Sequence, residues 1–247
     1  MIAIFTCFKN EAHILDEWIS HYKKRGIEHI YMINDYSNDN FLHIVQKYID
    51  DGFITIFNSD IQTKKTGKQI LLYNKYFKDI IKSLKYKWCF ILDMDEFLYS
   101  PNEINLNKVI EKYNDYSQLH IGMHNFGSSN FIKQPDNVVQ NFVYRSKYDE
   151  SKSFITFKSG FKSSKFIELD IHGHKVNGKS LFIKQYNDNS DLIINHYSIQ
   201  SLEIFKNRKL IIGDVNNYYN SNQMSMKYFK NRDDNDILDN RLKIQSQ

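Results

Sequence analysis

Residues 88–98 read WCFILDMDEFL, an apolar run that leads into three acidic residues within four positions. The run 88–92 predicts a buried strand with the acidic residues at its carboxyl end. In an extended chain, Asp93 and Asp95 point to the same side, about 7 Å apart at roughly 3.3 Å per residue. Two such carboxylates can share a divalent cation, and hard oxygen ligands suit Mn²⁺ or Mg²⁺. The alternative is a solvated acidic turn, but delivery by a buried strand favours a cation site.

The first half of the chain alternates apolar runs with amphipathic helical patterns. The predicted strands are 2–8, 29–33, 54–57, 88–92 and 119–123, and the predicted helices are 11–25, 38–48 and 68–84. Such alternation with short joints favours an α/β fold with a mainly parallel sheet flanked by helices. Ligands of these sheets bind beyond the carboxyl ends of the strands, where the acidic residues lie.

The second half of the chain has shorter apolar runs, which polar residues interrupt. Strands are predicted at 154–157, 166–171, 181–185 and 192–195, and a helix at 201–210. Asn, Asp and Gln become frequent over 216–247. We expect a single domain over 1–213, made of halves 1–100 and 101–213, and a C-terminal helical extension or tail over 214–247.

Composition excludes several classes of protein. With 41% hydrophobic and 25% charged residues, the 247-residue chain is too apolar to be disordered. The net charge of +4 comes without a block of five like charges, so we expect no nucleic-acid partner. No apolar run approaches the roughly 18 residues that span a bilayer, and the N-terminus resembles a strand more than a signal peptide. Cys7 and Cys89 lie within apolar runs and are expected to be reduced and buried, as in a cytosolic protein. We expect a cytoplasmic protein, with peripheral membrane association left open.

Further polar motifs follow the first two predicted strands. Asp35 stands where a carboxylate could bind the hydroxyls or the imino group of a nucleoside. The alternative is a turn, in which Ser37 or Asn38 caps the next helix. The segment 6–11 (TCFKNE) ends the first strand, where a nucleotide base could lie against the backbone. Asn10 is also expected to cap the helix that follows it.

Histidines and a lysine of the second half are further candidates. His196 closes a β-like run and could complete the shell of a cation opposite the two aspartates; a satisfied core histidine is the alternative. His172 and His174 form a His-Gly-His motif downstream of Lys158. Cations near a pyrophosphate neutralise a leaving group, whereas a solvated basic strand is the plain alternative. A zinc site at the two histidines lacks a third soft ligand.

Taken in order, these motifs resemble the family 2-like and family 92 glycosyltransferases with the GT-A fold. The resemblance covers about residues 2–210 and rests on FKNE at 8–11, EWI at 17–19, DYSND at 35–39, LDMDEF at 92–97, HGH at 172–174 and NHYS at 195–198. His124 departs from the pattern, because a Trp is expected there, and it lies in the half that would bind the acceptor.

The resemblance implies a GT-A fold, with residues 1–100 binding a nucleotide sugar and 101–213 binding the acceptor. It implies transfer of a sugar, galactose in several family 92 members, from a uridine diphosphate (UDP) sugar to a glycan hydroxyl, with inversion and with Mn²⁺ or Mg²⁺. The cation ligands would be Asp93, Asp95 and His196. The residues that would bind the nucleotide sugar are Thr6, Phe8, Asn10, Glu11, Asp35, Lys68, Asp93, Met94, Lys158, His172 and His174.

An inverting transfer needs a base within hydrogen-bond reach of the acceptor hydroxyl. Asp170 and Glu150 are the candidates, both in the second half of the chain. Two other functions stay open: a non-catalytic, lectin-like carbohydrate-binding relative, and a nucleotidyltransferase that makes nucleotide sugars. The second usually has a Gly-rich phosphate loop after its first strand, and residues 8–11 contain no Gly.

Overall fold

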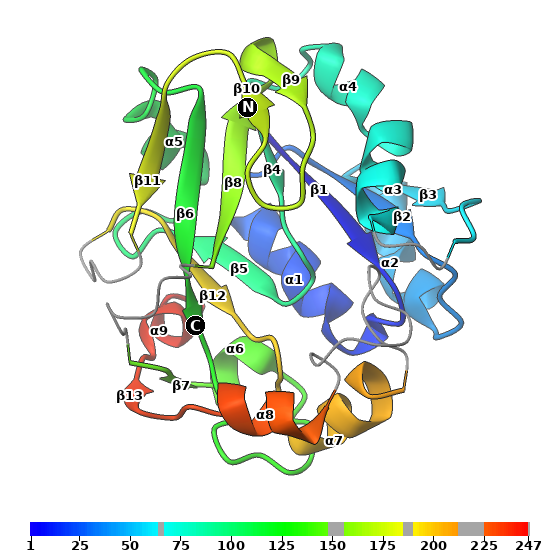
Figure 1. Ribbon diagram of the computed structural model, residues 1–247, viewed down its shortest axis with the longest axis vertical. Helices are drawn as coiled ribbons and strands as arrows, with labels where there is room; N and C mark the ends of the chain where they lie inside the picture. Colours follow the sequence, from blue (N-terminus) through cyan, green and yellow to red (C-terminus); the bar gives the residue numbers. More distant parts are fainter. Residues whose placement is uncertain (64–66, 148–155, 185–189, 212–224, 247) are drawn as a thin grey trace.

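The structure is a computed structural model that describes residues 1–63, 67–147, 156–184, 190–211 and 225–246 (Figure 1). The strands are β1 (Ile2–Phe8), β2 (His29–Asn34), β3 (Ile54–Asn58), β4 (Trp88–Ile91), β5 (Glu96–Tyr99), β6 (Gln118–Asn125), β7 (Tyr144–Arg145), β8 (Phe157–Lys162), β9 (Phe166–Glu168), β10 (Lys175–Val176), β11 (Ser180–Ile183), β12 (Ile193–His196) and β13 (Ile237–Leu238). The helices are α1 (Ala12–Lys24), α2 (Phe41–Asp50), α3 (Lys68–Tyr76), α4 (Lys78–Lys82), α5 (Leu106–Glu111), α6 (Val138–Asn141), α7 (Leu202–Ile204), α8 (Met226–Arg232) and α9 (Arg241–Gln245), with a 3₁₀ turn at Ser163–Lys165 and a π-helical turn at Phe205–Lys209.

One mixed sheet organises the molecule. Its strand order is β3-β2-β1-β4-β8-β6-β12-β5, and β11 pairs with β6. The strands β1 to β4 pair in parallel, as do β6, β11 and β12. The strands β8 and β5 run antiparallel to their neighbours. The predicted α/β fold with a mainly parallel sheet is therefore confirmed.

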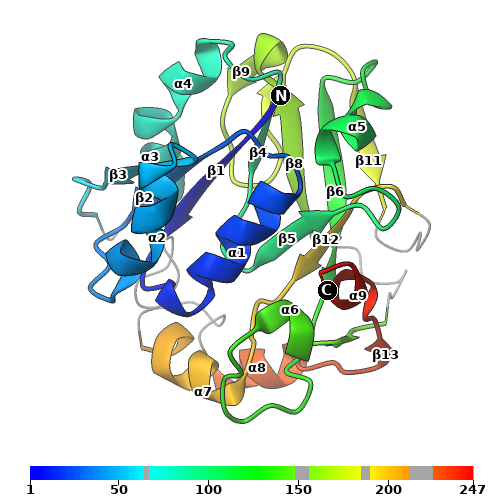
Figure 2. The same ribbon diagram turned by 180° about the vertical axis from the view of Figure 1, so that it is seen from behind.

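Helices cover both faces of the first four strands. Helix α1 lies behind the sheet in Figure 1 and in front of it in Figure 2, whereas α3 and α4 lie on the opposite face. The side chains of β1 alternate accordingly: Ile2 and Ile4 join the core under α1, and Ala3 and Phe5 join the core under α3. A strand covered on both faces needs apolar residues at every position, which explains the unbroken run at the N-terminus.

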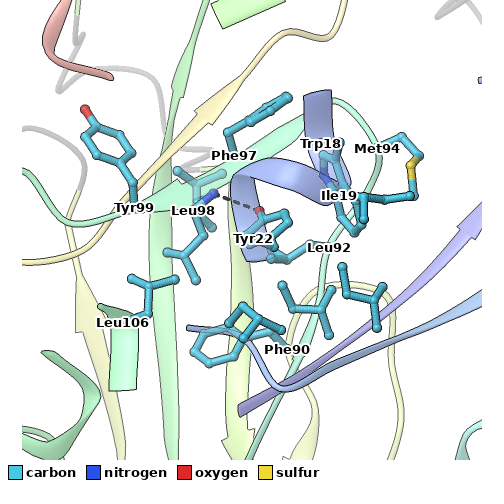
Figure 3. Close-up of a cluster of buried hydrophobic side chains, with 14 of the residues drawn as sticks. Trp18, Ile19, Tyr22, Phe90, Leu92, Met94, Phe97, Leu98, Tyr99 and Leu106 are labelled. Atoms are coloured by element: carbon cyan, nitrogen blue, oxygen red, sulfur yellow. Dashed lines mark hydrogen bonds between the residues drawn. The ribbon is translucent and has the colours of Figure 1, made fainter. Parts of the chain in front are cut away.

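Helix α1 also fixes the acidic turn that follows β4 (Figure 3). The hydroxyl of Tyr22 donates to the carbonyl oxygen of Glu96 at 2.8 Å and accepts from the amide of Leu98 at 2.9 Å. The indole nitrogen of Trp18 donates to the carbonyl oxygens of Asp93 and Glu96 at 3.1 and 2.9 Å. Two fully buried aromatic rings thus hold the backbone from which the acidic side chains extend.

Several predicted boundaries were wrong. The helix predicted over 68–84 is two helices, α3 and α4, which meet at Phe77. The strand β5 was not predicted, because it directly follows the acidic turn and is only four residues long. The strand predicted at 154–157 begins at Phe157 and runs to Lys162; 154 and 155 lie outside the described residues. The strand predicted at 166–171 ends at Glu168.

The C-terminal segment packs onto the second half of the chain. Its strand β13 pairs with β7, and Leu242 of α9 is buried in the main core. Phe229 of α8 packs against Phe205 and Ile199 in a smaller core. Within the described ranges, none of the helices is long and apolar enough to cross a membrane.

Candidate active site

The acidic turn meets His196, the last residue of β12. Asp95, Glu96 and His196 each offer one potential ligand atom, and these atoms lie within 4.8 Å of one another. Pairing of β12 with β5 produces this meeting, because His196 is opposite Glu96 in the register. The amide of Tyr197 also donates to the carbonyl oxygen of Asp95 at 2.8 Å. Asp95 lies in the turn, Glu96 begins β5 and His196 ends β12, so the pairing of two strands distant in sequence builds the cluster.

The contacts of His196 select one tautomer of its imidazole. Its Nδ1 is 3.0 Å from Oδ1 of Asn125, an atom that only accepts hydrogen bonds. We therefore assign the proton to Nδ1, which leaves the lone pair of Nε2 facing Asp95, whose Oδ1 is 3.6 Å away. A histidine that is oriented through one nitrogen and open at the other has the arrangement typical of metal ligands.

Asp93 has a different partner from Asp95. Its Oδ2 accepts a hydrogen bond from the buried Nζ of Lys158 at 2.6 Å, and its Oδ1 is 3.4 Å from Nε2 of Gln69. Burial opposes the charge of Lys158, but Asp93 and Glu96 outweigh it and raise the pKa of the ammonium group. The predicted cation ligands therefore separate: Asp95 and His196 come together, and the carboxylate of Asp93 pairs with Lys158.

Glu96 is buried, and its side chain hydrogen-bonds to the backbone of the acidic turn. Its Oε2 accepts from the amide of Asp93 at 2.9 Å, and its Oε1 is 3.6 Å from Nζ of Lys158. Burial raises the pKa of this carboxyl group well above its usual value, although Lys158 opposes the shift. Both oxygens of Glu96 are thus engaged by the turn and by Lys158, whereas Asp95 presents its carboxylate to His196.

Asp95 is kept ionised mainly by Lys209. Burial by itself raises the pKa of this carboxyl group, but the charge of Lys209, to which His196 adds when its imidazole is protonated, outweighs burial and holds the pKa well below its usual value. The Nζ of Lys209 donates to Oδ2 of Asp95 at 3.0 Å. A negative carboxylate is therefore available at this position at neutral pH.

Asp35 lies at the end of β2 and is paired with Lys68. Both carboxylate oxygens accept from Nζ of Lys68, at 2.6 and 2.7 Å, and both side chains are buried. Tyr36 follows with a positive φ of 57°, and its ring lies 5.7 Å from the same Nζ. A strained, partly exposed aromatic residue beside a buried ion pair is typical of ligand sites. Any contact of Asp35 with a nucleoside, as predicted, would therefore involve a carboxylate that is already paired with Lys68.

The loops after β1 and β2 are tied to each other. The amide of Asn10 donates to Oγ of Ser37 at 2.9 Å, and Oδ1 of Asn10 accepts from the amide of Asn38 at 2.8 Å. The expected cap at Asn10 was therefore wrong, and so was the alternative of a cap at Ser37 or Asn38: the cap positions are Glu11 for α1 and Asn40 for α2. The side chains satisfy backbone groups of the neighbouring loop instead, because parallel strands bring the two loops together.

The π-helical turn Phe205–Lys209 contributes cations that the sequence analysis missed. Arg208 donates to the carboxylate of Glu11 and, at 3.3 Å, to the carbonyl oxygen of Lys9. Burial raises the pKa of Glu11, although Arg208 opposes the shift. The sequence does contain a sign of these cations, because basic residues stand at 206, 208 and 209, shortly after His196.

Buried side chains also occupy three further positions predicted to bind the nucleotide sugar, namely Thr6, Phe8 and Met94. Phe8 and Met94 pack in the main core, so only their backbone can reach a nucleotide. Thr6 is also buried, and its hydroxyl oxygen has no hydrogen-bond partner among the described residues. The side chains at these three positions are therefore not exposed for contact with a ligand.

The two histidines of the His-Gly-His motif differ in their surroundings. His174 is buried, and its Nδ1 accepts from the amide of Asp170 at 3.2 Å. Burial, with Lys158 nearby, lowers the pKa of His174 to about 3, so this side chain is neutral. Part of the His172 side chain is exposed, but burial of the rest and the charge of Lys158 lower its pKa. The charge of Lys158 thus acts on both histidines, and the charge of Asp93 acts on His172 as well.

The two base candidates are not equally placed. Asp170 is exposed, and its charge acts on the pKa of His172. Asp170 is adjacent to the His-Gly-His motif, because its amide donates to Nδ1 of His174 at 3.2 Å. Glu150 lies outside the described residues.

His124, the departure from the family pattern, belongs to a buried ion cluster. Its Nδ1 is 3.6 Å from Oδ2 of Asp239, which also accepts from Nε of Arg145 at 2.8 Å. Arg241 donates to the same carboxylate. Burial alone raises the pKa of Asp239, but these donors outweigh it and hold the pKa far below its usual value. The cluster joins β6, β7 and the C-terminal segment.

Comparisons with known proteins identify relatives over most of the chain. The model of glycosyltransferase family 92 matches residues 3–244. A family 92 protein of Ricinus communis is 23% identical over 214 residues, which cover 84% of this chain and 37% of that protein. One of Oryza sativa subsp. japonica is 25% identical over 227 residues, 84% of this chain and 35% of that protein. The chain therefore spans about a third of the length of these relatives.

Solved structures show more distant likenesses. S. aureus TarS 1-349 in complex with UDP has a TM-score of 0.41 and 16% identity, covering 66% of this chain and 47% of that chain. HddC from Yersinia pseudotuberculosis has a TM-score of 0.40 and 13% identity, covering 74% of this chain and 91% of that chain.

Proposed function

Because the chain belongs to glycosyltransferase family 92, we propose that it transfers a sugar from a nucleoside-diphosphate sugar to a hydroxyl group of a glycan. The proposed donor is a UDP-sugar, with UDP-galactose the first to test, and the proposed outcome is inversion at the anomeric carbon. The proposal rests on one observation: Asp95 and His196 face each other beside the Asp93–Lys158 pair, in a chain of this family.

The side chains at this position fit a hard divalent cation such as Mn²⁺ or Mg²⁺. Asp95 offers a negative carboxylate, and His196 offers the lone pair of Nε2. Asp95 and His196 would hold the ion, with Glu96 bracing the turn behind them. A bound cation would offset the negative charge that develops on the departing diphosphate.

Residues around the proposed cation site would bind and orient the donor. The Asp35–Lys68 pair and Tyr36 support a nucleoside site at the ends of β1 and β2. Lys158 is buried beside Asp93, and its positive charge would attract the phosphate oxygens of the donor. On the acceptor side, Asp170 or Glu150 would take the proton from the attacking hydroxyl.

An assay of sugar transfer tests the proposal. The full chain is incubated with a panel of UDP-sugars, a mixture of oligosaccharide acceptors and Mn²⁺, and products are identified by mass spectrometry. We expect a glycan heavier by one sugar residue, absent from reactions with Asp95→Asn or with a chelator. Asp136→Asn, which changes an exposed carboxylate, is the matched control and should stay active. Sugar binding without nucleotide, cation or product would contradict the proposal and support the lectin-like alternative.

A further inference from the structure

A lysine already holds the carboxylate that the divalent cation would need. The Nζ of Lys209 lies 3.0 Å from Oδ2 of Asp95, and the two side chains are 21% and 15% exposed. Oδ1 of the same carboxylate faces Nε2 of His196 at 3.6 Å. An ammonium group on one oxygen of Asp95 would repel a divalent ion bound to the other, because both positive charges share one small, partly buried site.

The element that carries this lysine is irregular. Residues Phe205–Lys209 form a π-helical turn directly after the short helix α7. Single π-helical turns are rare and frequently occur at functional sites, where the extra residue changes the direction of the side chains. Here the turn brings two consecutive cations, Arg208 and Lys209, to the ends of β1 and β4.

Two nitrogen atoms of the Arg208 guanidinium group make no hydrogen bond within the described residues. Its Nη2 donates to Glu11, but its Nε and Nη1 are buried and have no hydrogen-bond partner within the described part of the chain. Buried donors without partners are unfavourable, and such groups are frequently satisfied by a ligand. A guanidinium group offers its donors as a planar fork that matches two phosphate oxygens.

We propose that Lys209 occupies the place of the divalent cation on Asp95 while the site is empty. Binding of the cation displaces Lys209 from Asp95, and the released ammonium then binds the diphosphate of the donor together with Arg208. This inference rests on the proposed function, because it takes Asp95 as a cation ligand. It assigns the π-helical turn a role in coupling cation binding to donor binding.

The test measures two affinities that should change in opposite directions. Mn²⁺ alone is titrated into the full chain and its variants and followed by electron paramagnetic resonance; UDP is then titrated by calorimetry at saturating Mn²⁺. Lys209→Met should bind Mn²⁺ about tenfold more tightly, because its competitor is gone, and UDP about tenfold more weakly. Lys206→Met removes an exposed lysine of the same turn and should leave both affinities unchanged. Damage to the fold would weaken both affinities, so opposite changes distinguish the proposed role from a structural one.

The remaining outcomes decide between this inference and the proposed function. Equal or weaker Mn²⁺ binding by Lys209→Met, relative to the unaltered chain, would overturn the inference and leave the proposed cation site standing. Failure of both the unaltered chain and Lys209→Met to bind Mn²⁺ would overturn both. Should Lys209→Met not fold, Lys209→Gln removes the charge and keeps a hydrogen-bond donor for Asp95, and the same opposite changes are expected of it.

Discussion

His196 lies directly opposite Glu96 in the antiparallel pairing of β12 with β5. This register brings an imidazole from late in the chain to the acidic turn after β4. A shift of the pairing by one residue would turn His196 to the other face of the sheet, so the cluster depends on the register. The architecture of the sheet, rather than any single loop, therefore sets the chemistry of the site.

The orientation of His196 through Asn125 leads to a first prediction. Asn125→Leu removes the acceptor of the Nδ1 hydrogen bond and should weaken Mn²⁺ binding by about tenfold, the lower end of the range for groups that orient a metal ligand. Thr156→Val is the control, because it removes the acceptor of Nδ2 of Asn125 and leaves Oδ1 of Asn125 in place for His196. Its Mn²⁺ affinity should match that of the unaltered chain; an Asn125→Leu variant with unchanged affinity would show that this hydrogen bond does not orient the ligand.

Tyr22 leads to a second prediction, on the stability of the acidic turn. Tyr22→Phe leaves the buried amide of Leu98 without its acceptor and should lower the free energy of unfolding by about 1–3 kcal/mol. Urea denaturation measures the change. Tyr144→Phe removes the hydroxyl of an exposed ring and should alter the free energy of unfolding by less than about 0.5 kcal/mol. Equal effects of the two substitutions would contradict the role assigned to Tyr22.

A third prediction concerns the close approach of β8 to β4. A Cβ atom added at Gly160 would lie 2.1 Å from the ring of Phe90, which is buried in the main core. Gly160→Ala should therefore lower the free energy of unfolding by about 1–3 kcal/mol or more, because the ring must move. At Gly173 the nearest atom, in the ring of His120, would be 3.3 Å away, so Gly173→Ala should be milder. Thermal unfolding of both variants checks this order, and the reverse order would show that Phe90 has room to shift.

The buried ion cluster around Asp239 leads to a fourth prediction, on pH dependence. The pKa of Asp239 is depressed in the folded chain, so its ionised form stabilises the fold above the ordinary Asp pKa of about 4, and the contribution fades as the pH falls below that value. Asp239→Asn should lower the free energy of unfolding by about 3 kcal/mol at pH 7, where Arg145 would lose a charged partner. The difference from the unaltered chain should shrink at pH 3. A difference independent of pH would mean that the charge of Asp239 is not what stabilises the cluster.

Local patterns in the sequence predicted the parts of the structure that depend on neighbouring residues. The run before Asp93 is a buried strand because both of its faces are covered, and this pattern is visible in the sequence alone. The alternation of strands and helices gave the parallel sheet, and the motifs gave the family resemblance that the family match confirms. The placement of Asp95 near His196 followed from the same motifs.

Pairings between distant segments explain what could not be predicted. The four-residue strand β5 exists because β12 pairs with it, and nothing in 96–99 alone separates it from the acidic turn. Asn10 bonds to Ser37 across two loops instead of capping its own helix. The contact of Lys209 with Asp95 depends on a π-helical turn, which has no reliable sequence signal.

Calorimetric titration of UDP, with and without Mn²⁺, is the most direct test of the central claim that Asp95 belongs to a cation-dependent nucleotide-sugar site. It is made on the unaltered chain and on Asp95→Ala, with Asp136→Ala as the control. We expect UDP binding to need Mn²⁺, to be lost in Asp95→Ala and to be retained in Asp136→Ala. The same UDP affinity with and without the cation and in both variants, or no binding by the unaltered chain in either condition, would contradict it.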